Sequence, residues 1–178
     1  MNRHLIAKLC MLTGTLGLIV VSANYLDAWH GSRQAVAVFA EAQAAAGDTL
    51  AVLRVPRLGL EVPVFEGTDA RTLNRGAGVV DGTALPGETG HVAISAHRDS
   101  FFRPLQEIEV GDLVELSSST GLQRFRVADI FITDPLDVDV LAPTSRSLLT
   151  LITCYPFRYI GFAPDRYIVR AEIIPTET

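Results

Sequence analysis

Three residues that together could perform acyl transfer each stand at the edge of an apolar run. Cys154 ends one strand-like run, His97 follows the apolar stretch 92–96, and Arg166 opens a third stretch with strand-like alternation. A thiolate can attack a carbonyl, an imidazole can pass a proton to the leaving amine, and a guanidinium can hold the developing oxyanion. We therefore interpret the three as a candidate thioester-forming site.

The order of the strands favours a meeting of two of these residues. The strand that ends at Thr153 and the strand that starts at Arg166 are linked by about twelve residues. If the two strands pair antiparallel, Cys154 and Arg166 lie at the same end of the sheet, near each other. A solvated charge at a strand end is the alternative interpretation of Arg166, and an inert core thiol is the alternative for Cys154.

A zinc site is the weaker interpretation of the thiol. His91 stands at the start of the strand that leads to His97, six residues away. A regular strand would separate these two imidazoles by about 20 Å, whereas ligands of one zinc ion lie within about 2.3 Å of it. His91 is therefore interpreted as a turn or surface residue.

Composition bounds the class of protein. The 178 residues are 48% hydrophobic and 20% charged, with a net charge of -5. The basic residues form no run, so nothing points to nucleic acid as a partner. The two cysteines, Cys10 and Cys154, form no disulfide framework.

Residues 1–23 are predicted to form a cytoplasmic tip and a transmembrane anchor. The stretch 5–23 is long enough to cross a bilayer, with Arg3 before it and Asp27 after it. This charge distribution predicts a single-pass protein of the cell membrane, with its N-terminus in the cytoplasm and its main domain outside. A cleaved signal peptide ending near Ala23 is the alternative.

The rest of the chain divides into a linker and a β-domain. Residues 24–48 include an Ala-, Gln- and Glu-rich segment, which predicts a helical stalk. Residues 49–176 alternate short apolar runs with turn signals, and short helical turns are expected near 69–74 and 101–106. Seven or eight strands without a long amphipathic helix predict a mainly β fold, a closed barrel or a sandwich. The expected strands are 50–55, 60–65, 91–96, 112–117, 122–133, 147–153 and 166–174.

Three short motifs carry a resemblance to a known family. The segment 150–154 reads TLITC, 94–98 reads ISAHR and 166–169 reads RYIV. In this order and behind a membrane anchor they resemble the motifs of sortases, which are cysteine transpeptidases. The resemblance covers about residues 49–175, and the segments YPF after Cys154 and APDR before the last strand are most similar to class D. It implies an eight-stranded β-barrel with short helices that works outside the cytoplasm.

The resemblance also implies roles and partners. Cys154 would be the nucleophile, His97 the general acid/base and Arg166 the group that stabilises the oxyanion or orients substrate. Thr153 and Ala96 would contact substrate, although the family usually has glycine where Ala96 stands. The donors would be surface proteins with a C-terminal LPxTG-like sorting signal. The acceptor would be an amine, from a cell-wall precursor or a pilin lysine.

No cofactor is predicted from these residues. Some members of the family use calcium, but Glu61, Glu66 and Asp69 form no recognisable ligand set here. The alternative to an enzyme is a non-catalytic, membrane-tethered β-barrel that binds peptides or cell-wall polymer, with Cys154 as an inert thiol.

Overall fold

The computed structural model describes residues 49–159 and 161–175. Within these residues the chain forms eight strands, one short α-helix and three 3-10 helices. The strands are β1 (Thr49–Val55), β2 (Leu60–Glu66), β3 (Ala77–Val79), β4 (His91–Ser95), β5 (Leu113–Ser118), β6 (Gly121–Thr133), β7 (Leu148–Tyr155) and β8 (Asp165–Ile173). The helices are η1 (Pro56–Leu58), α2 (Ala70–Arg75), η2 (Arg103–Glu107) and η3 (Asp139–Leu141).

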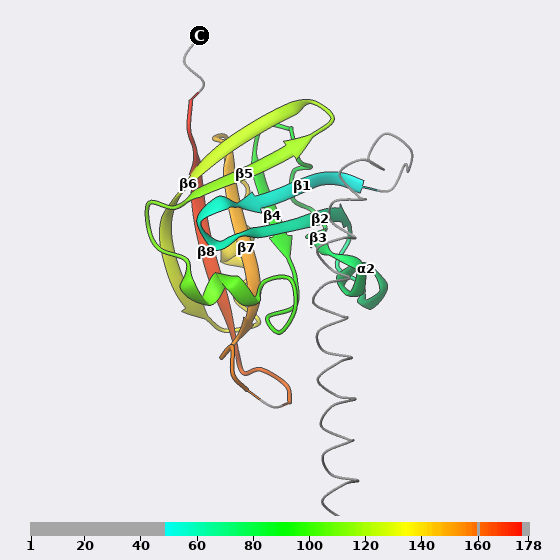
Figure 1. Cartoon of the computed structure of the whole chain (residues 1–178), viewed down its shortest axis with the longest axis vertical. Helices are drawn as coiled ribbons and strands as arrows, with labels where there is room; N and C mark the ends of the chain where they lie inside the picture. Colours follow the sequence, from blue (N-terminus) through cyan, green and yellow to red (C-terminus); the bar gives the residue numbers. More distant parts are fainter. Residues whose placement is uncertain (1–48, 160, 176–178) are drawn as a thin grey trace, which may run out of the picture. The chain divides into compact units, whose positions relative to one another are not determined.

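The eight strands close into one barrel in the order β1-β2-β3-β4-β7-β8-β6-β5. Two neighbouring pairs, β2 with β3 and β4 with β7, are parallel. The long strands β6, β7 and β8 run side by side along one wall (Figure 1). The prediction of a mainly β, closed barrel is confirmed for the described residues.

The strand β3 is the one that the sequence pattern missed. It has only three residues, Ala77 to Val79, and its middle residue is Gly78. A Cβ at this glycine would lie 2.0 Å from the carbonyl oxygen of Gly67, so only glycine allows this close approach of two backbones. The seven expected strands are all present, with ends that differ by one or two residues.

Helix α2 forms where a helical turn was expected. Its N-cap is Asp69, whose carboxylate accepts hydrogen bonds from the backbone N–H groups of Arg71 and Thr72. These bonds, that of Thr72 foremost, hold the pKa of the Asp69 carboxyl below its ordinary value. The cap satisfies N–H groups that a helix leaves free at its first turn.

Alternation along the strands fills the barrel and leaves a second set of residues on its outside. Leu149 and Leu151 of β7 belong to the core and are fully buried, as are Val169 and Ala171 of β8. Because successive side chains of a strand point to opposite faces, Cys154 and its outward-facing neighbours point away from this core.

The predicted tip and anchor (1–23) and linker (24–48) lie outside the described residues. A search of the described residues for a helix long and apolar enough to span a bilayer finds none.

Candidate active site

Cys154 is the second-last residue of the strand β7. Strand pairing places it directly opposite Arg166 of β8. The thiol is free and half-buried. The two strands do pair antiparallel, the condition under which the sequence predicted that Cys154 and Arg166 lie near each other.

His97 follows the strand β4, which pairs with β7 in parallel. Ser95 is level with Ile152, and the ladder continues with a hydrogen bond from Ala96 N to the Ile152 carbonyl at 3.3 Å. Carrying this register forward by two residues places His97 level with Cys154. His97 thus continues the outward-facing positions of β4. Because β4 and β8 flank β7, His97 and Arg166 lie on opposite sides of Cys154.

A buried hydrogen bond fixes the backbone at this point. The Thr153 hydroxyl donates to the Ala96 carbonyl at 2.7 Å. Thr153 and Ala96 are 2% and 3% exposed, so the protein itself covers both residues here, and their contact with substrate stays a prediction. Their effect on the site is positional, because they join the residues that precede Cys154 and His97.

The three residues form one row across neighbouring strands, with Cys154 in the middle. Adjacent strands lie about 4.8 Å apart, so the row spans about 10 Å. The three side chains make no hydrogen bond to one another in the part of the chain that the structure describes. The Arg166 guanidinium instead donates to the Asp165 carbonyl at 3.1 Å. Catalytic hydrogen bonds are often loose before substrate binds.

Arg98, the residue after His97, binds the loop between β7 and β8. Its Nη2 donates to the carbonyls of Tyr159 and Gly161 at 2.9 and 3.1 Å, and its guanidinium lies 5.8 Å from the Tyr159 ring centre. This loop leads from Cys154 to Arg166, so Arg98 ties together the segments that carry all three residues of the row. Sequence reasoning missed this contact, and the only available signal was its position next to His97.

Three aromatic rings support the ends of β7 and β8. Tyr155 stacks on Tyr167 with ring centres 6.1 Å apart, and Phe157 meets Tyr167 edge-on at 5.0 Å. Burial, and then the neighbouring Tyr155, raise the pKa of the Tyr167 phenol above its ordinary value. The phenol therefore stays uncharged at neutral pH and serves packing.

His91 was expected at a turn or on the surface, and this expectation is wrong. The side chain is 4% exposed. Its Nδ1 donates to the Ala142 carbonyl at 2.8 Å, which leaves Nε2 to accept from the Thr150 hydroxyl at 2.7 Å. The side chain lies outside the core because it points to the outer face of β4. A loop covers that face, and both ring nitrogens are occupied by these two bonds.

The covering loop is the segment between β6 and β7, residues 134–147. Its short helix η3 contributes Val140, which is 7% exposed. Ile168 of β8 points away from the core and is nevertheless fully buried. The outer face of β4, β7 and β8 is thus covered at the positions of His91, Thr150 and Ile168, which lie nearer the middle of the sheet than Cys154 does. Leu136 and Val138 of this loop are 85% and 71% exposed, which leaves apolar side chains at its rim.

The acidic residues considered for calcium do not form a ligand set. Glu61 is bound to Arg54 at 2.7 Å, and the carboxylate of Asp69 caps α2. Among the described residues, no three His, Cys, Asp or Glu side chains are gathered so that they could hold a metal ion. The described acidic side chains therefore supply no set of carboxylate ligands of the kind that calcium prefers.

Comparisons with known proteins agree on one family. Residues 53–174 match the family model described as the sortase domain. The chain is 37% identical over 124 residues to Sortase D of Bacillus subtilis (strain 168), which covers 69% of this chain and 63% of that relative. It is 26% identical over 133 residues to Sortase A of Streptococcus agalactiae, with 70% and 52% covered. The match thus spans less than two thirds of the length of these curated relatives.

Solved structures give the same result. The Sortase D5 transpeptidase of Clostridium perfringens has a TM-score of 0.65 at 30% identity, over 72% of this chain and 81% of that one. Sortase A from Corynebacterium diphtheriae has a TM-score of 0.67 at 29% identity, over 75% and 64%. The closed barrel, the motifs at Cys154, His97 and Arg166, and the family model together show that this chain belongs to the sortase family.

Proposed function

We propose that the protein is a membrane-anchored cysteine transpeptidase. It cleaves an LPxTG-like sorting signal in a surface protein and transfers the acyl group to an amine at the cell surface. The row formed by His97, Cys154 and Arg166 carries this proposal, because it sets a nucleophile between a proton carrier and a permanent cation. The family of the chain supports the same reaction class.

In the first half-reaction the Cys154 thiolate attacks the carbonyl carbon of the scissile peptide bond. The carbonyl oxygen becomes an oxyanion, and the Arg166 guanidinium can donate to it from the neighbouring strand. The C–N bond breaks as the imidazolium of His97 gives its proton to the leaving amine. The products are a thioester on Cys154 and a free amine.

In the second half-reaction an amine attacks the thioester carbonyl. The imidazole of His97, neutral after the first step, takes the proton of the attacking nitrogen. A new amide forms, the C–S bond breaks, and the sulfur leaves as the thiolate. The pair of thiolate and imidazolium is restored, so the cycle needs no cofactor and no water.

The donor peptide is placed on the outer face of β7 and β8. This face lies on the Arg166 side of Cys154, and the β6–β7 loop, which bonds His91 through the Ala142 carbonyl, covers the outer face of the neighbouring strand β4. The exposed apolar rim at Leu136 and Val138 suits the apolar residues of an LPxTG-like signal. Cell-membrane attachment rests on the composition of residues 5–23.

The test is covalent capture. Cys154→Ala should abolish the mass increase that an LPxTG-like peptide produces on the wild-type chain, as measured by intact-protein mass spectrometry. Turnover of the peptide by Cys154→Ala at the wild-type rate would contradict the mechanism. The rival, a non-catalytic barrel, predicts that a small methanethiosulfonate reagent modifies Cys154 only after unfolding. A catalytic thiol reacts in the folded state and is protected by the peptide.

A further inference from the structure

A cavity of about 480 Å³ lies beside His97, and none of its lining residues belongs to β7 or β8, whose outer face is proposed for the donor peptide. Two segments far apart in sequence form it: the end of α2 and the loop that follows β4. Its walls are Leu73, Asn74, His97, Asp99, Ser100 and Phe101. His97 is therefore one of the lining residues, and the others include an aspartate, an asparagine and a serine.

The strand order places this cavity on the opposite side of His97 from the thiol. Strand β4 has β7 on one side, with Cys154, and β3 on the other. Gly78 of β3 is level with Ser95, so the antiparallel register brings Gly76, the residue that follows α2, level with His97. His97 thus stands between the cavity and Cys154. The face proposed for the donor peptide lies beyond Cys154, toward Arg166.

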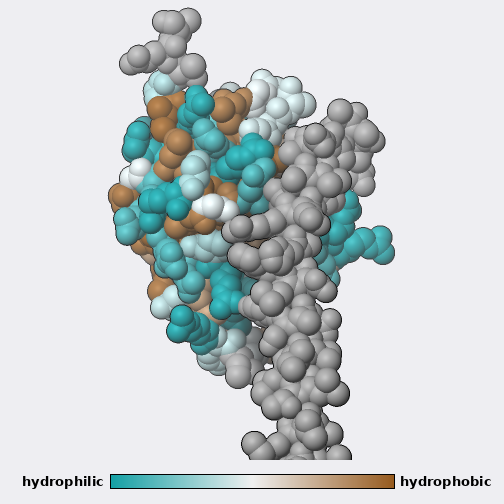
Figure 2. Space-filling model, viewed as in Figure 1, coloured by the Kyte–Doolittle hydropathy of each residue, from teal (hydrophilic) through white to brown (hydrophobic). Residues whose placement is uncertain are grey.

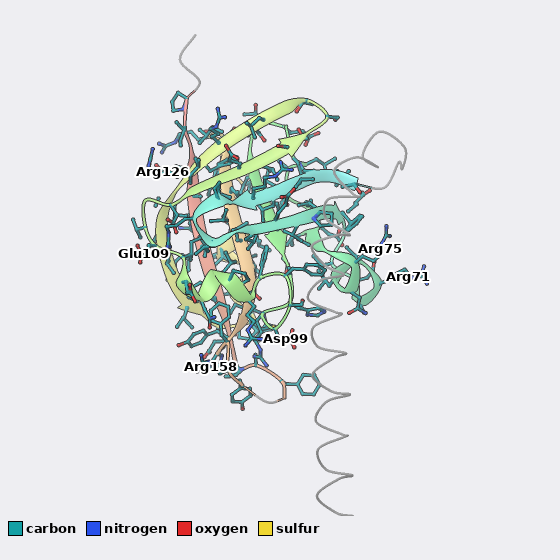
Figure 3. The ribbon with its side chains drawn as sticks, in the orientation of Figure 1. Arg71, Arg75, Asp99, Glu109, Arg126 and Arg158 are labelled. Carbon is teal, nitrogen blue, oxygen red and sulfur yellow. The ribbon has the colours of Figure 1, made fainter. Side chains whose placement is uncertain are left out.

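The charge of the cavity wall is negative. Asp99 is exposed, and its carboxylate has no hydrogen-bond or ion-pair partner among the described residues. Arg71 and Arg75 of α2, the helix whose end forms one side of the cavity, do not line it. Figure 3 shows them projecting from α2 away from the barrel, whereas Asp99 lies at the barrel end near the β7–β8 loop. A free carboxylate attracts an ammonium group and does not favour a carboxylate or phosphate.

We propose that this cavity receives the amine acceptor, with Asp99 recognising the acceptor as an ammonium ion. The inference rests on the proposed transpeptidase function and adds where its second substrate binds. The ammonium loses one proton to solvent, and the neutral nitrogen then attacks the thioester carbonyl on Cys154. His97, between the two, takes the second proton as the C–N bond forms and the C–S bond breaks. The sulfur leaves as a thiolate, so atoms and charges balance.

Entry from this side explains how two substrates can use one small site. In the proposed reaction the acyl chain remains on the outer face of β7 and β8 after the first half-reaction. An amine that came across the same face would have to displace it. An amine that comes past His97 meets the general base first and the thioester carbonyl next, as the second half-reaction requires.

The experiment measures the acceptor dependence of ligation with an LPxTG-like donor peptide and two acceptors. Glycinamide is an ammonium ion near neutral pH, whereas hydroxylamine is uncharged. Asp99→Asn removes the charge at constant shape and should raise the KM for glycinamide roughly three-fold, as expected for one exposed charge pair. The KM for hydroxylamine should not change. The difference should disappear in about 1 M NaCl, where exposed charges are screened.

A second variant tests the proposed acceptor site by filling the cavity with a larger side chain. Asn74 is exposed on α2, so Asn74→Trp fills the cavity without touching the core. It should raise the KM for both acceptors roughly ten-fold, an effect on binding that charge alone would not give. Glu109→Gln is the matched control, since it removes one exposed carboxylate on another part of the barrel (Figure 3), and it should change neither KM.

The readouts separate this inference from the function on which it rests. Unchanged acceptor KM values in both Asp99→Asn and Asn74→Trp, with a normal acyl-enzyme, would overturn the inference alone. A loss of acylation and aminolysis by one common factor would also overturn it, because the cavity would then serve the donor or the fold. If the wild-type chain forms no acyl-enzyme at all, the proposed function fails and the inference falls with it.

Discussion

The two sides of this barrel share one core but use their outer surfaces differently. On the side of β1, β2 and β5, outward-facing charged residues pair in partial contact with water, as Arg54 does with Glu61 at 2.7 Å. Hydrophilic and hydrophobic residues are interspersed on the face that Figure 2 shows. On the side of β4, β7 and β8, outward-facing residues such as Thr150 and Ile168 are fully buried.

The difference comes from the loop between β6 and β7. It covers the outer face of β4, β7 and β8, so that polar groups there are removed from water and must find partners in the protein. His91 meets this requirement by bonding Thr150 below it and the Ala142 carbonyl above it. On the opposite side water satisfies the same kinds of groups, so pairing there has little energetic consequence. The covered face therefore holds its polar side chains, such as His91, in place through hydrogen bonds within the protein.

The largest expected difference between the two sides concerns one arginine on each. Arg166→Lys should lower kcat for ligation by roughly a hundred-fold, since a lysine cannot reproduce the planar guanidinium donors next to the oxyanion. Arg54→Lys makes the same exchange on the opposite side and should leave kcat unchanged. Steady-state ligation assays check both, with thermal unfolding as the test of folding.

The kcat values of Arg166→Lys and Arg54→Lys together test whether only one side of the barrel takes part in the reaction. Equal rates for wild type and Arg166→Lys would remove this residue from the proposed chemistry. A large loss in Arg54→Lys would show that the exposed side also contributes to the reaction.

A stability difference of intermediate size should come from His91. His91→Leu leaves the Thr150 hydroxyl and the Ala142 carbonyl without a partner under the loop, which costs about 1–3 kcal/mol for each buried group left unsatisfied. In a double-mutant cycle with Thr150→Val, the two residues should couple by about 1 kcal/mol or more. The matched cycle of Arg54→Leu with Glu61→Leu should give about 0.2–1 kcal/mol.

Urea unfolding measures both cycles. If the coupling on the exposed side equalled or exceeded that under the loop, the loop would not create an interior environment and the comparison would fail.

The smallest expected effect is a pH dependence of stability at the ion pair between Arg57 of η1 and Asp112, the residue before β5. Arg57 donates to both carboxylate oxygens of Asp112, at 2.5 and 2.6 Å, and this hydrogen bonding holds the pKa of Asp112 below its ordinary value. A lowered pKa stabilises the folded chain above the pKa of unfolded Asp, which is about 3.9, and this contribution is lost as pH falls through the lower folded value.

Asp112→Asn should therefore destabilise the chain at pH 7 and approach the stability of wild type below about pH 3. Urea unfolding at the two pH values measures the difference. A deficit of the same size at both values would mean that the ion pair is not its cause.

Local pattern predicted much of the fold and part of the site. Alternation along β7 and β8 set which residues face the core, because the two-residue period of a strand is written in the side chains themselves. The short connection between these strands was enough to predict that, in an antiparallel pair, Cys154 and Arg166 lie near each other at one end of the sheet; the structure shows them directly opposite. By contrast, β3 was missed because its three residues become a strand only by pairing with β2 and β4.

His91 shows why the rest could not be predicted. Its position at the start of a strand was visible, but its burial depends on the loop carrying Ala142, 51 residues away. The contact of Arg98 with the Tyr159 carbonyl joins residues 61 apart and likewise left no local signal. Such contacts depend on which strands become neighbours, and that choice is made by the whole barrel.

The sequence by itself therefore determined the strand faces, the family motifs and the nearness of Cys154 to Arg166, all of which depend on residues close together along the chain. Only the tertiary structure decided that His97 lies beside Cys154, because β4 and β7 pair in parallel across more than fifty intervening residues. It also placed the end of α2 against the other side of His97. Parallel neighbours carry no turn signal that joins them, so closure of the barrel was required to bring these residues together.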